Sequence, residues 1–235
     1  MKKSVRSAPG PDNLKATSIL DIHHEEVQKL ARTLAAQGLP DRIRLQRAHL
    51  LLVAMLRAVY SVDEWQPASK TLLSRRGSCS QRMACLEAVA RAAGVPTRVR
   101  AIHVKGNFWY PRFRFLRGFI PKRILLVWPQ FFLQGIWVDF DELHAPMERL
   151  VAAATHGFAN NSESLFEAVQ DTPVDFLGKT CGIACAKPEH DLSRYVLDDQ
   201  GFFDSRDQAF EHLGSFQQTM RGRLFEMLLG DRKSS

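Results

Sequence analysis

The sequence predicts an α+β fold in which helices precede and follow a small antiparallel sheet. Residues 79–93 are rich in Ala, Met, Leu and Glu, which favours a helix. Residues 97–104 then alternate in polarity and carry Val and Ile, as strands do. Residues 124–133 and 136–140 flank a Gln-Gly pair, which indicates a strand, a tight turn and a return strand. A helix and three strands between helical flanks are typical of α+β proteins.

The N-terminal part is predicted to contain a tail followed by two helices. Residues 1–12 are basic and contain Pro and Gly, which indicates a flexible tail. From Asn13 apolar residues recur at three- to five-residue steps until Gly38, which predicts a first helix. Asp41 is an expected N-cap for a second helix whose many apolar residues predict that it is largely buried. Residues 13–60 are therefore expected to form an N-terminal helical segment.

The C-terminal part is predicted to be mainly helical. Helices are expected at residues 146–154, 162–169, 205–213 and 215–229, with a loop at 171–188. The predicted division of the chain is thus the tail, the helical segment, a core at residues 61–145 and a C-terminal extension at 146–235.

The composition is that of a globular protein with a buried core. The 235 residues are 45% hydrophobic and 24% charged, enough apolar material to bury a core. The four cysteines are too few for a disulfide scaffold, so a reducing cytoplasm is the expected location. The apolar runs at residues 49–55 and 124–133 are shorter than the roughly 18–20 residues that a spanning helix needs, so no membrane association is expected. The net charge of +7 favours an acidic partner.

Cys79 stands at the predicted start of the helix over residues 79–93. The unpaired backbone N–H groups and the positive dipole end of a helix N-terminus favour a thiolate over a thiol. The thiolate is the nucleophile in cysteine catalysis, which makes Cys79 a candidate nucleophile. Cys85 lies inside the same helix and is expected to pack in the core.

Two blocks of sequence follow a known pattern. The first begins with Gly77-Ser78-Cys79 and ends with R-A-A-G-V-P-T-R-V at residues 91–99, and the second is W-P-Q-F-F-L-Q-G-I-W-V-D-F-D at residues 128–141. They resemble the transglutaminase-like superfamily, whose blocks are a G-x-C start with an R-A-x-G-I-P-A-R-V exit, and H-x-W-x-E-x-Y-L-x-G-x-W-x-x-x-D. The resemblance implies a papain-like transglutaminase core, in which a helix bearing the cysteine packs on an antiparallel sheet.

The resemblance also implies roles for single residues. Cys79 occupies the position of the nucleophile, and Asp141 that of the carboxylate that orients the base, with Asp139 as the alternative if the strand register differs. The family's histidine is expected two residues before Trp128, where this chain has Leu126.

The absent histidine leaves three interpretations open. The chain has lost catalysis and binds a partner; or His103 or His144 replaces the base; or the helix terminus alone lowers the pKa of the Cys79 thiol. The predicted function is therefore cysteine-dependent acyl transfer or amide hydrolysis through a thioester, on a peptide or protein substrate. The alternative is an inactive fold that binds an acidic protein or peptide. No cofactor is expected in either case.

The segment at residues 105–123 holds six Lys and Arg and six aromatic residues with no acidic residue. In the resembled family this segment helps to wall the active site, so Arg112 and Arg114 are candidates for substrate binding, together with Trp128 and Gln130; Gln130 stands where the family pattern has Glu. Basic and aromatic residues can also contact nucleic acid, but no nucleic-acid-binding module is recognisable.

Cys181, Cys185 and His190 form a sparse cluster near the predicted C-terminal loop. Their spacing is looser than a zinc-binding C-x-x-C pair and a second ligand pair is absent, so no metal site is expected.

Overall fold

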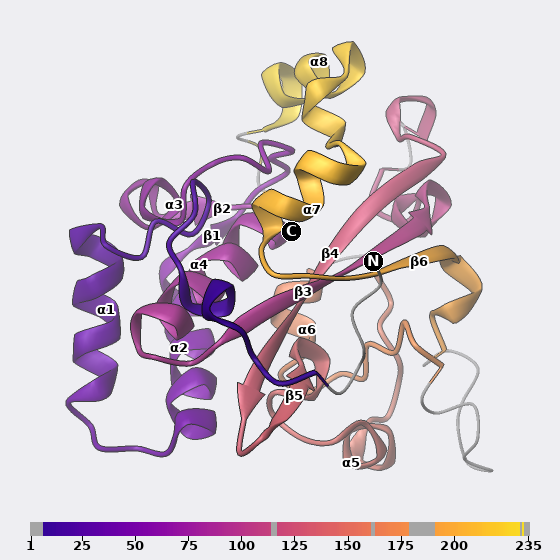
Figure 1. Ribbon diagram of the computed structural model, residues 1–235. Helices are drawn as coiled ribbons and strands as arrows, with labels where there is room; N and C mark the ends of the chain where they lie inside the picture. The colour runs from indigo at the N-terminus through magenta and orange to yellow at the C-terminus, as the bar shows by residue number, and fades with distance from the viewer. Residues whose placement is uncertain (1–6, 114–116, 161–162, 179–190, 231, 233–235) are drawn as a thin grey trace.

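A four-stranded antiparallel sheet crosses the molecule, and helices lie against it (Figure 1). The computed structural model describes residues 7–113, 117–160, 163–178, 191–230 and 232. The helices are α1 Glu25–Ala35, α2 Asp41–Met55, α3 Ala68–Ser74, α4 Cys79–Ala92, α5 Met147–Ala153, α6 Leu165–Ala168, α7 Arg206–Leu213 and α8 Met220–Leu229. The strands are β1 Arg57–Ala58, β2 Arg76–Gly77, β3 Thr97–Lys105, β4 Arg123–Leu133, β5 Ile136–Asp139 and β6 Val196–Phe203. Short 3-10 helices lie at Pro11–Leu14, Gly106–Trp109, Arg117–Phe119, Phe140–Glu142, Ser193–Tyr195 and Phe216–Gln218. The predicted α+β class is confirmed.

The sheet has the strand order β5-β4-β3-β6. Thr97 at the start of β3 pairs with Phe131, and the pairing continues without a break along β4. Gln134 and Gly135 both have positive φ, 52° and 83°, as the tight turn between β4 and β5 requires. The three strands and the turn that the sequence predicts are all present.

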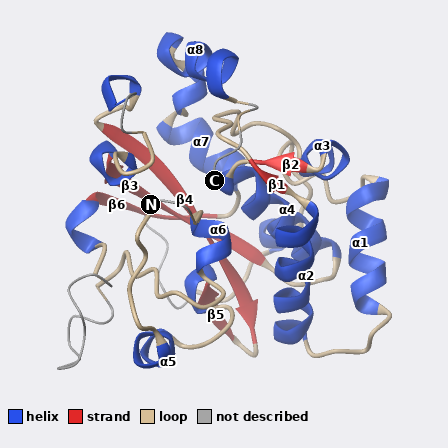
Figure 2. Cartoon of the chain, turned by 180° about the vertical axis from the view of Figure 1, so that it is seen from behind, coloured by secondary structure: helices blue, strands red, loops and turns tan. Residues whose placement is uncertain are grey.

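Helix α4 is the central element. Every residue from position 81 to 91 is buried, and the helix packs between α1, α2 and α3 on one side and β3 and β4 on the other (Figure 2). A helix that is enclosed on all sides must satisfy its polar side chains internally. Cys85 is among its fully buried residues, as predicted.

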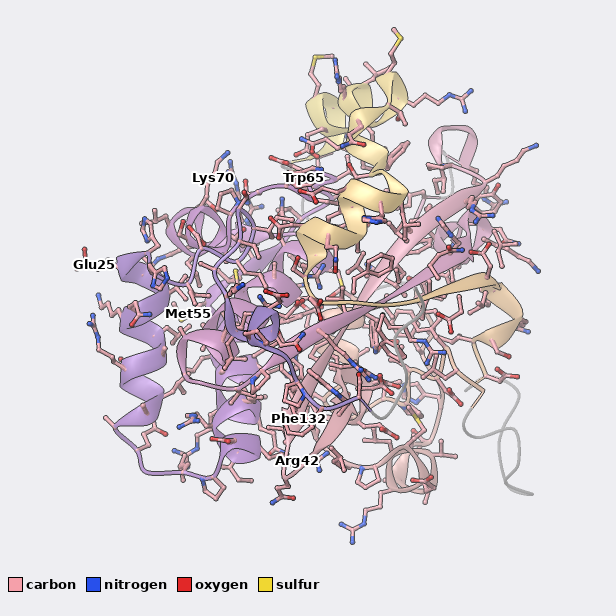
Figure 3. The ribbon with its side chains drawn as sticks, viewed as in Figure 1. Glu25, Arg42, Met55, Trp65, Lys70 and Phe132 are labelled. Atoms are coloured by element: carbon pink, nitrogen blue, oxygen red, sulfur yellow. The ribbon has the colours of Figure 1, made fainter. Side chains whose placement is uncertain are left out.

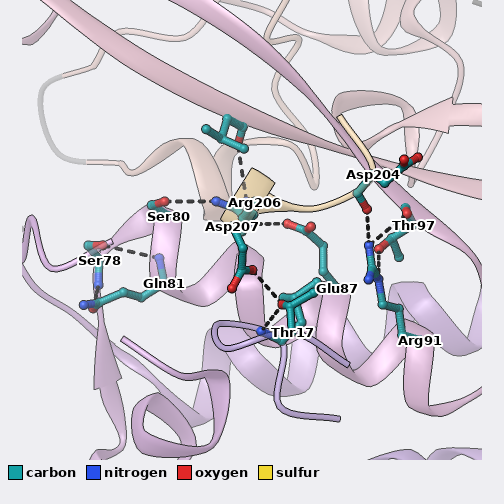
Figure 4. A network of polar contacts seen from close by, with 12 residues as sticks. Thr17, Ser78, Ser80, Gln81, Glu87, Arg91, Thr97, Asp204, Arg206 and Asp207 are labelled. Atoms are coloured by element: carbon teal, nitrogen blue, oxygen red, sulfur yellow. Dashed lines mark hydrogen bonds and ion pairs between the residues drawn. The ribbon is translucent and has the colours of Figure 1, made fainter. Parts of the chain in front are cut away.

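Arg206 and Glu87 form a fully buried ion pair between α7 and α4 (Figure 4). The Arg206 guanidinium also donates to Ser80 Oγ at 3.0 Å and to the Val127 carbonyl at 3.2 Å. Burial raises the pKa of the Glu87 carboxyl, and the Arg206 charge opposes that rise. The pair therefore fixes α7 against both α4 and the sheet.

The first helix begins later than the sequence predicts. The prediction placed its start at Asn13, but α1 begins at Glu25. In the preceding segment, backbone and side-chain donors bond to α7: the Ile19 N–H donates to Asp207 Oδ1 at 3.1 Å, and Thr17 Oγ1 donates to Asp207 Oδ2 at 2.6 Å. Side-chain acceptors from a distant helix thus replace the local helical bonds that apolar spacing predicted.

The segment before α1 lies against the sheet. Within the predicted tail, residues 1–12, positions 1–6 lie outside the described residues. The carbonyl of Ser7 accepts from Trp137 Nε1 on β5 at 2.6 Å.

Strand β6 was not predicted. The C-terminal extension was expected to be mainly helical, yet β6 pairs with β3 as the fourth strand, from Val99 opposite Phe203 to Val104 opposite Val196. The sequence Asp-Asp-Gln-Gly inside β6 has little intrinsic preference for a strand, and the register shifts twice along it. Pairing with the exposed edge of β3 decides its conformation.

Helix α2 exposes more apolar surface than predicted. One face is buried, but four other apolar side chains of the helix are each 38–42% exposed: Ile43, Leu50, Leu51 and Met55. Figure 3 labels Arg42 and Met55 at the two ends of this helix; Arg42 Nε donates to the Leu143 carbonyl at 3.1 Å. The helix is therefore held to the core by one face and by its first turn.

None of the described helices combines the length and the hydropathy that crossing a bilayer requires.

Replacing Arg206 with Met should leave the buried Glu87 carboxylate without its cationic partner. We expect the free energy of unfolding, measured by urea titration, to fall by about 3–5 kcal/mol, the usual cost of removing one partner of a buried pair. The double variant Arg206→Met/Glu87→Gln removes both charges and should recover part of that loss. A double variant no more stable than Arg206→Met would show that the ion pair is not the source of the effect.

Candidate functional site: the Cys79 pocket

Cys79 is the first residue of α4, as the sequence predicts. Ser78 caps the helix: its hydroxyl accepts from the Gln81 N–H at 3.4 Å, and Gln81 Oε1 accepts from the Ser78 N–H at 2.9 Å. Gln81 Nε2 in turn donates to the Asp63 carbonyl at 2.8 Å. This capping box fixes the position of the thiol at the helix start.

The thiol lines a cavity of about 190 Å³, called here the Cys79 pocket. Its wall comes from the loop before α3, the start of α4, the segment between β3 and β4, strand β4, residues before α6 and the C-terminal helices. The lining residues are mostly apolar and include Met83, Trp109, Phe113, Leu126, Leu165, Phe216 and Phe225.

The surroundings of Cys79 disfavour its thiolate. Burial raises the pKa of the Cys79 thiol to about 11, a rise that Arg82 and Arg112 oppose and Glu167 reinforces. A hydrogen bond with the Phe166 backbone also opposes the rise. Desolvation therefore outweighs the groups that favour the anion, and the thiol is protonated at neutral pH.

The two candidate histidines lie elsewhere. His103 on β3 has its Nδ1 2.8 Å from Asp198 Oδ1, and Arg123 bonds to the same carboxylate. His144 Nε2 lies 2.8 Å from Nδ1 of the buried His49. Within the part of the chain that the structure describes, no residue lining the Cys79 pocket is a histidine.

Four other predicted residues lie on β4, at the end of β5 and in the 3-10 helix that follows β5. Trp128 Nε1 donates to Asp141 Oδ1 at 3.0 Å, and Gln130 Nε2 donates to Asp139 Oδ1 at 2.5 Å. All four are buried, and none of them lines the Cys79 pocket. Leu126 does line it, so the structure brings Leu126 and Cys79 together.

Arg112 is the predicted substrate-binding residue that reaches the pocket. Its Nε donates to Asn160 Oδ1 at 2.7 Å, and Asn160 Nδ2 donates to the Phe108 carbonyl. Its Nη2 is buried and has no hydrogen-bond partner among the residues that the structure describes. Arg114 lies outside the described residues.

Glu64 also lines the pocket and was not singled out by any sequence pattern. Burial raises the pKa of its carboxyl to about 8, opposed by the Arg206 charge and by a hydrogen bond with the Phe216 backbone. Glu64 reaches this position because α7 and the 3-10 helix after it pack over the loop before α3, a contact between segments about 150 residues apart that the sequence does not reveal.

The C-terminal extension forms part of the pocket wall. Phe216 and Phe225 contribute to its wall, and Glu226 on α8 accepts from Ser61 Oγ at 2.8 Å and from the Val62 N–H at 2.5 Å. The described residues of the predicted C-terminal extension therefore contribute to the site.

The described residues contain no group of three or more His, Cys, Asp or Glu side chains arranged to hold a metal ion. Cys181, Cys185 and His190 lie outside the described residues.

The His49–His144 pair should make stability depend on pH. Burial lowers the pKa of His49 from 6.5 to about 4, and burial also lowers that of His144. As the pH falls, the unfolded chain therefore binds a proton at His49 before the folded chain does. The contribution of the neutral His49 to the free energy of unfolding is fully present above about pH 6.5 and is lost as the pH drops towards 4. We expect a loss of about 3 kcal/mol from His49, because one pKa unit corresponds to about 1.4 kcal/mol.

The measurement is the free energy of unfolding by urea at several pH values, with His49→Gln as the control. The variant lacks the titrating ring, so its stability should fall less between pH 6.5 and 4. Equal slopes for the two proteins would contradict the assignment to His49.

The family model of the transglutaminase-like superfamily matches residues 28–142. This match extends from α1 to the 3-10 helix after β5 and contains Cys79, Leu126 and Asp141. No curated protein and no solved structure matches the chain at a significant level.

Proposed function

Since residues 28–142 belong to the transglutaminase-like superfamily, we propose that this core binds a ligand in the Cys79 pocket without catalysis by a cysteine–histidine pair. The observation that carries the proposal is the wall of the pocket. Leu126 and Cys79 both line it, and no described lining residue is a histidine. An apolar wall replaces the proton acceptor that thiol chemistry on an amide requires.

The protonation state of Cys79 supports this proposal. With a pKa of about 11, roughly one thiol in 10⁴ is ionised at pH 7. The carboxylates of Asp141 and Asp139 are engaged by Trp128 and Gln130 and do not line the pocket. Cys79, Asp139 and Asp141, which a thiol enzyme of this family would use in catalysis, thus have structural roles in this chain.

The size and lining of the pocket support binding. An apolar cavity of about 150 Å³ is large enough for benzene, and the Cys79 pocket measures about 190 Å³. Arg112 in its wall and the net charge of +7 favour an acidic peptide or protein as the partner.

A second candidate is cysteine-dependent acyl transfer or amide hydrolysis. Cys79 would attack the carbonyl carbon, the C–N bond would break as the amine takes a proton, and water or an amine would release the acyl group from the thioester. The observation in its favour is Glu64, a carboxyl of the same pocket with a pKa of about 8 that can exchange protons near neutral pH.

Alkylation of Cys79 by iodoacetamide separates the two candidates. In a background of Cys85→Ser, Cys181→Ser and Cys185→Ser, we expect slow labelling with an apparent pKa well above the free-thiol value of about 8.5, because the thiol is desolvated. Fast labelling at pH 7 with an apparent pKa below that value would favour the thiol enzyme.

Placing a histidine at position 126 tests whether Leu126 occupies the place of the base. In Leu126→His the imidazole should stabilise the Cys79 thiolate and raise the rate of alkylation at pH 7 at least about 10-fold, as one unit of pKa shift would. Leu126→Gln is the matched control, since it adds a polar side chain that does not titrate. Equal rates in the two variants would show that a side chain at position 126 does not reach the thiol.

A further inference from the structure

We infer that the Cys79 pocket binds an apolar monocarboxylate, with the carboxylate on the Arg112 guanidinium and the apolar body in the cavity. The inference rests on the proposed binding function and names the ligand class for that same site. It follows from the donor that Arg112 leaves unused, from the charges of the wall and from the wall's apolar surface.

Arg112 presents an unused donor. Its Nε donates a hydrogen bond to Asn160 Oδ1 at 2.7 Å, which fixes the plane of the guanidinium. Its Nη2 is buried and lacks a partner among the described residues. A buried N–H without an acceptor costs free energy, which an acceptor entering the pocket would recover.

The charges of the wall favour an anion. The titratable residues of the described lining are Tyr60, Glu64, Cys79 and Arg112. Burial holds Glu64 and Cys79 in their neutral forms at pH 7, with pKa values of about 8 and about 11. Arg112 is therefore the cation of the wall, and burial lowers its pKa because its charge is poorly solvated.

The charges behind the wall are paired with one another. Arg82 donates to Glu167, and Arg206 donates to Glu87. Arg82 and Arg206 do not line the pocket, whereas Arg112 does, so an incoming carboxylate can reach the Arg112 guanidinium. A charge-assisted bond between guanidinium and carboxylate is about twice as strong as a neutral hydrogen bond.

The remainder of the wall accommodates an apolar body. Trp109, Leu165 and Phe225 contribute aromatic and aliphatic surface around the cavity. A cavity of about 190 Å³ accommodates a benzene-sized ring with a short chain. A phosphate dianion fits less well, because it needs several donors around it and the wall of the pocket is mostly apolar.

Titration of the full chain with 3-phenylpropionate and with the neutral 3-phenylpropanamide tests the inference. Calorimetry, or the fluorescence of Trp109 and the other tryptophans, should show the acid binding at least about 10-fold more tightly than the amide at pH 7. Arg112→Gln should abolish that preference. Arg117→Gln removes an exposed Arg of the same segment, which lies over the Tyr110 ring, and should retain it.

Protection of Cys79 from alkylation at pH 9 gives a second measurement of binding in the pocket. The acid should slow labelling of the wild type more than the amide does. A tetrapeptide ending in Phe, with a free or an amidated C-terminus, distinguishes a peptide terminus from a free acid as the source of the carboxylate; stronger binding of the free terminus than of the amidated one supports the inference.

Equal binding of acid and amide by the wild type would overturn the carboxylate assignment, and this comparison does not depend on how any variant folds. The proposed binding function would survive that result. Absence of binding by every probe would also overturn the inference. The proposed function itself fails only if Cys79 in addition labels rapidly at pH 7.

Discussion

The buried ion pair between Arg206 and Glu87 is the interaction on which the arrangement of the site depends. It joins α7 to α4, and the same guanidinium reaches the Val127 carbonyl on β4. Because both side chains are removed from water, neither can be displaced without leaving a charge in the core. The position of α7 is therefore fixed relative to the helix that begins with Cys79.

The C-terminal wall of the Cys79 pocket follows from this arrangement. The chain after α7 places Phe216 and Phe225 in the wall, and Glu226 bonds to Ser61 and Val62 on the opposite side. Cys79 is partly buried, and burial raises the pKa of its thiol in spite of its position at the helix N-terminus. Burial likewise raises the pKa of the Glu64 carboxyl to about 8 and lowers the pKa of Arg112. A pocket with these properties suits the binding of an anionic, apolar ligand better than the generation of a thiolate.

Much of the core was predictable because its signals are local. The cap at Ser78, the small residues of α4 and the Gln134-Gly135 turn act within a few positions of one another, so the helix, three strands and Cys79 at the helix start were placed correctly. The start of α1 and the existence of strand β6 were not predicted correctly. In the first case Asp207 supplies hydrogen-bond acceptors from a distant helix. In the second case pairing with the edge of β3 forms a strand from residues that have little intrinsic preference for one.

The sequence alone determined the α+β class, the membership of the core in its superfamily and the absence of a histidine two residues before Trp128. Only the tertiary structure decided which side chains share the pocket, because Glu64, Arg112 and Phe225 come from segments far apart in the chain. It also decided the protonation of the Cys79 thiol, since burial makes the largest contribution to the cost of ionising it.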